Sequence, residues 1–263
     1  MNKKTTLEPR HERETDCKIS QLLLHILARE AVVSMFTTLV LTDQQTARCS
    51  AAAARWAIDI AEDLNLNEHE VSITYLAALL HDIGMMAIPD EAMNPPGELD
   101  PAAWAIIKTH SQNGGHTLSG IDQFDELAEV VLSHHERYDG QGYPLGLSGD
   151  MIPLSSRIIC VADCYSAMVS DLPHRPKLSP KQAQEELLIN KGTKFDPGVV
   201  DTFLRILGEQ DDAYRRGDRA DFSVESQKVR LLHRLDAEWP CHLVQRPRPD
   251  TSGKSVRASL LSD

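Results

Sequence analysis

Apolar residues recur at helical spacing along most of the chain. From residue 17 to residue 41 they fall three or four positions apart, which predicts one amphipathic helix. A second helix is predicted from about Asp43, through an alanine-rich segment, to Leu64. We find no convincing strand pattern, so the chain is predicted to be all-α.

Helix-start signals divide the rest of the sequence. Asn67 and Glu70 have the spacing of a capping box, which predicts a third helix ending at His81-Asp82. A helix from about 124 to 135 is predicted to present His134 and His135. Prolines and a glycine predict a loop over residues 85–98. An N-cap residue followed by a first-turn proline predicts further helix starts at Asp100-Pro101, Ser179-Pro180 and Asp196-Pro197. The first of these helices is predicted to carry Lys108 and His110.

Sequence character divides the chain into four parts. Residues 1–16 are highly charged and expected to be disordered. Residues 17–41 form the predicted N-terminal helix, which could mediate a homodimer. Residues 42–207 form the main helical domain. Residues 208–263 form a charged C-terminal extension, predicted to be partly helical and then disordered.

Charge narrows the range of partners. The 263 residues include 39 acids and 27 bases, a net charge of −12, which disfavours attraction to a nucleic acid polymer or an anionic membrane. The apolar run 22–41 is interrupted by His25, Arg29 and Glu30, so no membrane span is expected. Five cysteines without a CxxC pair, and no secretory leader, predict reduced thiols in the cytoplasm.

The densest candidate chemistry lies in residues 134–150, HHERYDGQGYPLGLSGD. Together with two upstream segments and one downstream helix, it supplies imidazoles and carboxylates, the ligands that manganese, iron and zinc accept. A bridged metal pair about 3.5–4 Å apart could share a hydroxide and hydrolyse a phosphodiester. The candidate ligands are His81, Asp82, His110, His134, His135 and Asp163.

Each of these residues also has an ordinary explanation. A double histidine can cap a helix, where the dipole favours it, and a lone histidine is often a core residue. Asp163 is harder to explain in this way, because a buried carboxylate in an apolar helix needs a cation or several donors. The joint occurrence of all six favours a metal site.

The motifs, in their order, resemble the HD-GYP family of HD phosphohydrolases. They are AALLHDIG, Pro89-Asp90, KTH, HHERYDGQGYPLGL, RIICVAD and KFDPGVVDTF, and the resemblance covers roughly residues 30 to 207. It implies an HD-domain helical bundle, with a five-helix core plus extra helices. It also implies hydrolysis of cyclic di-GMP to pGpG or GMP at a centre of two or three metals, often iron.

The resemblance further implies roles for individual residues. His81 and Asp82 are the signature pair, and residues 142–144 are the GYP loop. His110, His134 and His135 complete one metal site, while Asp163 belongs to the other. In the expected mechanism a metal-bridging hydroxide attacks phosphorus while Asp82 bridges two divalent ions, with Fe or Mn favoured over Zn or others.

The sequence departs from the family at the site itself. Cys49 stands where the family has its first metal-binding histidine, Gln45 where some members have a glutamate for a third metal, and Met85 where a lysine ends the signature. Cys49 could ligate as a thiolate or be a small buried hydrophobe. Gln45 makes a third metal unexpected. Losing the lysine removes a phosphate contact, a kind of change that commonly costs about 10²-fold in rate.

Several residues are candidates for substrate binding. Arg137, Arg175 and Lys177 could hold phosphate, although ordinary surface charge is the preferred interpretation of Lys177. Tyr143 could face the metal pocket or a guanine, or it could anchor the loop on the core.

Two functions therefore remain. The first is a metal-dependent phosphodiesterase acting on cyclic di-GMP. The second is a catalytically weak or inactive member that binds cyclic di-GMP as a receptor, or docks a diguanylate cyclase or other signalling protein.

Overall fold

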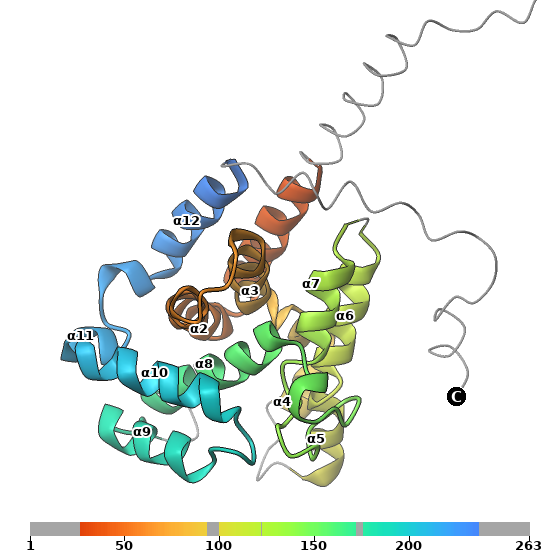
Figure 1. Cartoon of the computed structure of the whole chain (residues 1–263). Helices are drawn as coiled ribbons and strands as arrows, with labels where there is room; N and C mark the ends of the chain where they lie inside the picture. The colour runs from red at the N-terminus through yellow and green to blue at the C-terminus, as the bar shows by residue number, and fades with distance from the viewer. Residues whose placement is uncertain (1–26, 94–99, 122, 172–175, 237–263) are drawn as a thin grey trace, which may run out of the picture.

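The fold is a bundle of helices (Figure 1). The computed structural model describes residues 27–93, 100–121, 123–171 and 176–236. Within these ranges the regular structure is helical, apart from one isolated bridge between Lys191 and Phe195. The predicted all-α class is therefore confirmed.

The helices follow one another closely along the chain. Residues 27–42 are helical and precede α2. The labelled elements are α2 (Gln44–Asp63), α3 (Glu68–Leu80), η1 (Ile83–Ala87), α4 (Asp90–Met93), α5 (Pro101–Ile107), α6 (His110–Ser119), α7 (Asp125–Leu132), η2 (Gly149–Met151), α8 (Leu154–Val169), α9 (Pro180–Ile189), α10 (Pro197–Glu209), α11 (Asp212–Arg215), η3 (Ala220–Phe222) and α12 (Val224–Asp236).

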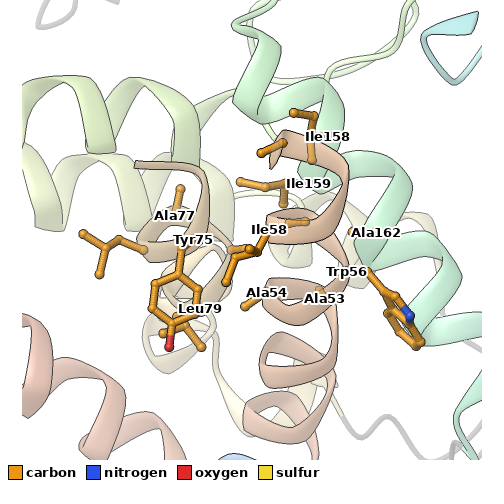
Figure 2. Close-up of a cluster of buried hydrophobic side chains, with 14 of the residues drawn as sticks. Ala53, Ala54, Trp56, Ile58, Tyr75, Ala77, Leu79, Ile158, Ile159 and Ala162 are labelled. Atoms are coloured by element: carbon orange, nitrogen blue, oxygen red, sulfur yellow. The ribbon is translucent and has the colours of Figure 1, made fainter. Parts of the chain in front are cut away.

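The core is built around α2, which packs against both α3 and α8 (Figure 1). Small side chains such as Ala53 and Ala54 let the neighbouring helices approach closely (Figure 2). Trp56 fills the space beside them, with its ring centroid 5.0 Å from that of Tyr165 in an edge-on arrangement. A long alanine-rich helix is therefore the centre of the bundle, because its side chains can be buried on several faces at once.

The predicted helix starts are confirmed where side-chain caps are present. The Asn67 side chain accepts from the Glu70 backbone N–H at 3.0 Å, and the Glu70 side chain accepts from the Asn67 backbone N–H at 2.9 Å. N-caps of the predicted kind also begin four other helices, each contributing about 1 kcal/mol to stability. They are Asp43, Asp100, Ser179 and Asp196.

Two boundary predictions were wrong. The expected loop over 85–98 contains the end of η1 and the short helix α4, because Pro89 opens a helical turn whose first backbone bond runs from Ala92 N–H to the Pro89 carbonyl. The helix expected to carry both Lys108 and His110 is two helices. Helix α5 is capped at Lys108, and α6 begins at His110.

The N-terminal helix is described only in part. Residues 27–42 bury Ala28, Val32, Phe36 and Leu39 in the core. Residues 17–26 of the predicted helix lie outside the described residues, and its role in a homodimer stays a prediction. Among the described helices, none combines the length and apolarity needed to cross a membrane.

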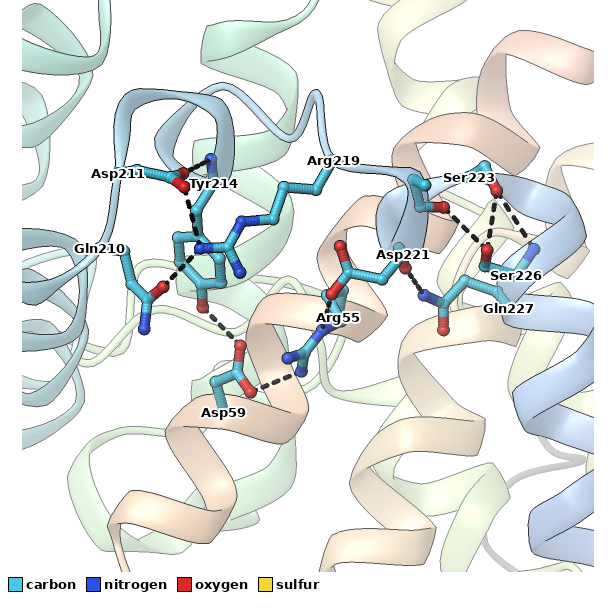
Figure 3. A network of polar contacts seen from close by, with 11 residues as sticks. Arg55, Asp59, Gln210, Asp211, Tyr214, Arg219, Asp221, Ser223, Ser226 and Gln227 are labelled. Carbon is cyan, nitrogen blue, oxygen red and sulfur yellow. Dashed lines mark hydrogen bonds and ion pairs between the residues drawn. The ribbon is translucent and has the colours of Figure 1, made fainter.

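The described part of the C-terminal extension packs on α2 (Figure 3). Arg55 contacts both Asp59, at 2.5 Å, and Asp221, at 3.1 Å, while the Tyr214 hydroxyl donates to Asp59 at 2.5 Å. Five apolar or aromatic side chains of this segment are buried: Tyr214, Phe222, Val224, Leu231 and Leu235. Residues up to 236 thus share the core of the bundle, and a domain boundary at residue 207 stays a prediction.

The loop after His135 is organised by one buried carboxylate. Glu136 is 2% exposed and accepts from the backbone N–H groups of Leu145 at 2.6 Å, Gly146 at 3.1 Å and Leu147 at 3.0 Å. Gly142 passes so close to this residue that a Cβ atom there would lie 2.5 Å from the Glu136 Cα. The loop is therefore folded back against Glu136, the residue that follows the two histidines.

We expect Gly84→Ala to lower the free energy of unfolding by at least about 2 kcal/mol. A Cβ at Gly84 would lie 2.0 Å from the His110 carbonyl oxygen, so η1 and α6 would have to separate. The matched control is Gly208→Ala in α10, where nothing lies within 4 Å and the helix gains up to about 1 kcal/mol. Urea unfolding of both variants checks this, and equal stabilities would contradict it.

We expect Glu136→Ala to cost about 3 kcal/mol of stability, because three backbone N–H groups lose a charged acceptor. Glu136→Gln keeps one acceptor oxygen and should cost about 1–2 kcal/mol. Glu129→Ala, at an exposed position on α7, should stay within about 0.5 kcal/mol of the parent. The measurement is again urea unfolding, and a loss in the Glu129 variant as large as that at Glu136 would refute this account.

Candidate metal centre

The candidate ligands come from four separate helices and converge beside the core. His81 and Asp82 follow the last residue of α3, His110 begins α6, and His134 and His135 follow α7. Asp163 lies within α8. His81 and His134 are fully buried, and His110 is 3% exposed. Their convergence depends on contacts between helices that are distant in sequence.

Three of the histidines share one hydrogen-bonding pattern. The Nδ1 atom of each lies against the carbonyl oxygen three residues earlier: Ala78 at 2.9 Å from His81, Ile107 at 2.8 Å from His110, and Val131 at 2.5 Å from His134. A carbonyl oxygen can only accept, so Nδ1 carries the proton in all three rings. In the neutral form of each ring, Nε2 is thereby left with a lone pair, which is the ligand form of histidine.

The Nε2 atoms point at one another and at carboxylates. His110 Nε2 lies 3.2 Å from His134 Nε2. His81 Nε2 lies 3.1 Å from Asp82 Oδ2 and 3.5 Å from Asp163 Oδ1, yet it has no aligned hydrogen bond. Lone pairs and anionic oxygens at these distances repel one another unless a cation lies between them. The donor set therefore fits a divalent metal.

Asp82 stands between two groups of ligands. Its Oδ1 faces His110 Nε2 at 3.4 Å, and its Oδ2 faces His81 Nε2 at 3.1 Å. On one side, ligand atoms of Asp82, His110, His134 and His135 all lie within 4.8 Å of one another. On the other side are His81 and Asp163. A carboxylate whose two oxygens face different ligand groups has the geometry of a bridge.

The electrostatics agree with this donor set. Burial, followed by the charges of neighbouring histidines, lowers the pKa values of His134 and His135, so both imidazoles are neutral at physiological pH. Burial opposes ionisation of Asp82, but the adjacent His81 holds the pKa of that carboxyl well below its usual range. Burial alone would lower the pKa of His81, whereas the nearby Asp82 and Asp163 raise it. The net direction is upward, so a metal ion at His81 Nε2 would have to displace a proton.

Cys49 lies on the Asp163 side of the centre. Its thiol accepts a weak hydrogen bond from Gln45 Nε2 at 3.7 Å. Burial, and then the charge of Asp163, raise the pKa of the thiol, so it is protonated at neutral pH. Ligation would require loss of that proton. Both interpretations of Cys49, as ligand and as small core residue, stay predictions.

The residues predicted to bind substrate differ in their contacts with neighbouring side chains. Arg137 is held by Asp139 through two hydrogen bonds, of 3.0 and 2.6 Å, and Lys177 pairs with Asp171 at 3.1 Å. Arg175 lies outside the described residues. The Tyr143 ring lies 4.9 Å from the His135 ring, measured between centroids, so it borders the candidate ligands.

Two lysines near the centre were missed by the sequence analysis. Lys108 Nζ lies 5.5 Å from the centroid of the Tyr143 ring and 5.7 Å from that of Trp104. Lys194 lies close enough to His135 for its charge to help lower the pKa of that histidine. Lys108 precedes His110 by two positions and could have been suspected. Lys194 is 59 positions after His135; it begins the motif KFDPGVVDTF, but no local pattern places its side chain near that histidine.

Comparison with known proteins places the chain in a family. A family model described as HD domain matches residues 33–199. The chain is 43% identical over 148 residues to the cyclic di-GMP phosphodiesterase response regulator RpfG of Xanthomonas campestris pv. campestris, covering 56% of this chain and 39% of that protein. It is 32% identical over 179 residues to 3'3'-cGAMP-specific phosphodiesterase 2 of Vibrio cholerae, covering 67% and 34%.

A solved structure supports the fold. A cyclic GMP-AMP specific phosphodiesterase of V. cholerae superposes with a TM-score of 0.56 at 20% identity, covering 78% of this chain and 53% of that one. The chain spans half or less of the length of these two sequence relatives. The match to residues 33–199, with the HD pair and the glycine loop in place, shows that the chain belongs to the HD domain family, in its HD-GYP branch.

Proposed function

We propose that the chain is a metal-dependent phosphodiesterase that hydrolyses cyclic di-GMP to pGpG or GMP. One observation carries the proposal: Asp82 directs one oxygen to His110 and the other to His81, between two separate ligand groups. A single structural metal would not require a carboxylate in that position. The two relatives are a cyclic di-GMP phosphodiesterase and a 3'3'-cGAMP-specific phosphodiesterase, which supports a cyclic dinucleotide as the substrate class.

The residues of the chain divide the work of such a centre. Two divalent ions, when bound, supply electrophilic catalysis and an activated water. His110, His134 and His135 would hold one ion, and His81 with Asp163 the other. The Nδ1 atoms of His81, His110 and His134 donate to backbone carbonyls, and these bonds keep the three rings from rotating. Tyr143 closes the side of the site next to His135.

The donor set constrains the metals. Imidazole nitrogens with carboxylate oxygens suit iron or manganese, and also zinc. We propose two ions and no third, because Gln45 offers only a neutral amide where a third ion would need a carboxylate. The cytoplasmic location, the homodimer and a partnership with a diguanylate cyclase are further proposals that rest on the sequence analysis alone.

A receptor without turnover is the second candidate, favoured by two residues. Met85, in η1, presents no charge three positions after Asp82. Cys49 presents a protonated thiol on the Asp163 side. Weak retention of the second ion would leave a protein that binds a cyclic dinucleotide but cuts it slowly or not at all.

We expect the full chain, loaded anaerobically with Fe(II) or Mn(II), to release pGpG or GMP from cyclic di-GMP. His81→Ala should abolish this, because it removes a buried ligand beside Asp82 and Asp163. Parallel assays with 3'3'-cGAMP decide between the two substrates named for the relatives. Binding of cyclic di-GMP without turnover, in protein that holds two ions, would favour the receptor and contradict the enzyme.

We expect Cys49→His to increase the metal retained after anaerobic dialysis, and Cys49→His with Met85→Lys to raise turnover by about 10-fold or more. The imidazole replaces a thiol that must first lose its proton, and the lysine adds a cation. Elemental analysis and product release are the measurements. If Cys49→Ser instead loses a metal ion that the parent protein retains, the Cys49 thiolate is itself a ligand. The expectation that histidine improves metal retention then fails.

A further inference from the structure

We propose that Lys194 binds a phosphate group at the metal centre and supplies the positive charge that Met85 does not. The identity of the natural phosphate ligand rests on the proposed function. The position of Lys194 does not, because it follows from the geometry of the segment 191–196 and of the loop after His135.

The backbone fixes Lys194 beside that loop. Asp139 N–H donates to the Thr193 carbonyl at 2.8 Å, and Tyr138 N–H donates to the Lys194 carbonyl at 3.2 Å. The turn is tightened by Gly192, which has a φ of +79° and donates to the Phe195 carbonyl at 2.8 Å. Lys194 is therefore held against the peptide that carries the double histidine.

The side chain of Lys194 faces the metal centre. Its ammonium lies close enough to Cys164 and Asp163, adjacent residues of α8, for their negative charges to raise its pKa. Interaction with Cys164 raises the pKa of Lys194 against the opposing effect of burial, so the ammonium stays charged at neutral pH. Nζ also lies 5.3 Å from the centroid of the buried Phe195 ring.

Lys194 has no carboxylate counter-ion among the described residues. Among the described residues, no carboxylate lies within 4.0 Å of its ammonium, whereas Arg137, Lys177 and Arg157 each have at least one such partner. A half-buried ammonium that makes no ion pair with a carboxylate is costly, and an anionic ligand would reduce that cost. Of the three cations predicted from sequence to hold phosphate, the two that are described, Arg137 and Lys177, each pair with an aspartate, and Lys194 does not.

Phosphate is the anion that the surroundings favour. Asp163 and His135 lie on opposite sides of the Asp82 bridge, and Lys194 is close enough to both for their charges to interact. A phosphate whose oxygens met ions held by these residues would lie near the ammonium. Lysine serves in phosphate sites as a point charge without strict geometry, which suits a flexible side chain on a fixed backbone.

The test compares Lys194→Met with Lys191→Met by isothermal titration of inorganic phosphate into the Mn(II)-loaded full chain. Lys191 is a matched control, because it lies three positions away and pairs with Asp201 at 2.5 Å on the surface. We expect the Kd for phosphate to rise about 10- to 100-fold in Lys194→Met, the range for one charge-assisted hydrogen bond. Lys191→Met should match the parent, and Lys194→Arg should stay within a few-fold of it.

Metal content, measured on every variant, separates a ligand contact from structural support. If Lys194→Met loses manganese, the lysine supports Asp163 rather than phosphate, and the proposal is overturned. An unchanged Kd, or no phosphate binding by the loaded parent, overturns it too. A parent that binds phosphate through Lys194 but cleaves no cyclic dinucleotide would uphold this inference while refuting the proposed function.

Discussion

The arrangement of the centre depends on three short hydrogen bonds from imidazole Nδ1 to the carbonyl three residues earlier, at His81, His110 and His134. Each bond ties a ring to the end of its own helical segment, fixes its tautomer and directs Nε2 inward. Because the three rings are buried, an inward lone pair cannot be satisfied by bulk water. The fold thus creates a concentration of electron-rich atoms that a cation must neutralise.

Close approach of the backbone brings these segments together. Gly84 lies so near α6 that a Cβ would clash with the His110 carbonyl, and Gly114 faces the same junction, where a Cβ on it would lie 3.5 Å from the Gly84 backbone nitrogen. On the other side, the small side chains of α2 let α3 and α8 pack against it. Small residues at both contacts therefore set the separation of the ligand-bearing helices, and this separation decides whether Asp82 can face both ligand groups.

The charge around the centre is organised by pairing. The protein is strongly acidic, and the cations near the glycine loop are mostly neutralised by aspartates. An anionic substrate must therefore rely on metal and on whichever cations lack partners. This makes the position of Lys194 consequential: its half-buried charge lies near the centre, whereas Cys49 presents a protonated thiol and Met85 carries no charge.

The sequence by itself determined the helical class, the helix starts and the identity of the candidate ligands. These depend on local physics: the 3.6-residue period, an N-cap oxygen meeting a nearby N–H, and the residue types that metals accept. Tertiary structure alone decided which oxygen of Asp82 faces which histidine, that Arg137 is already held by Asp139, and that Lys194 bonds to Tyr138, 56 residues earlier. Such contacts depend on the packing of helices that are distant in sequence, and no local pattern along the chain records them.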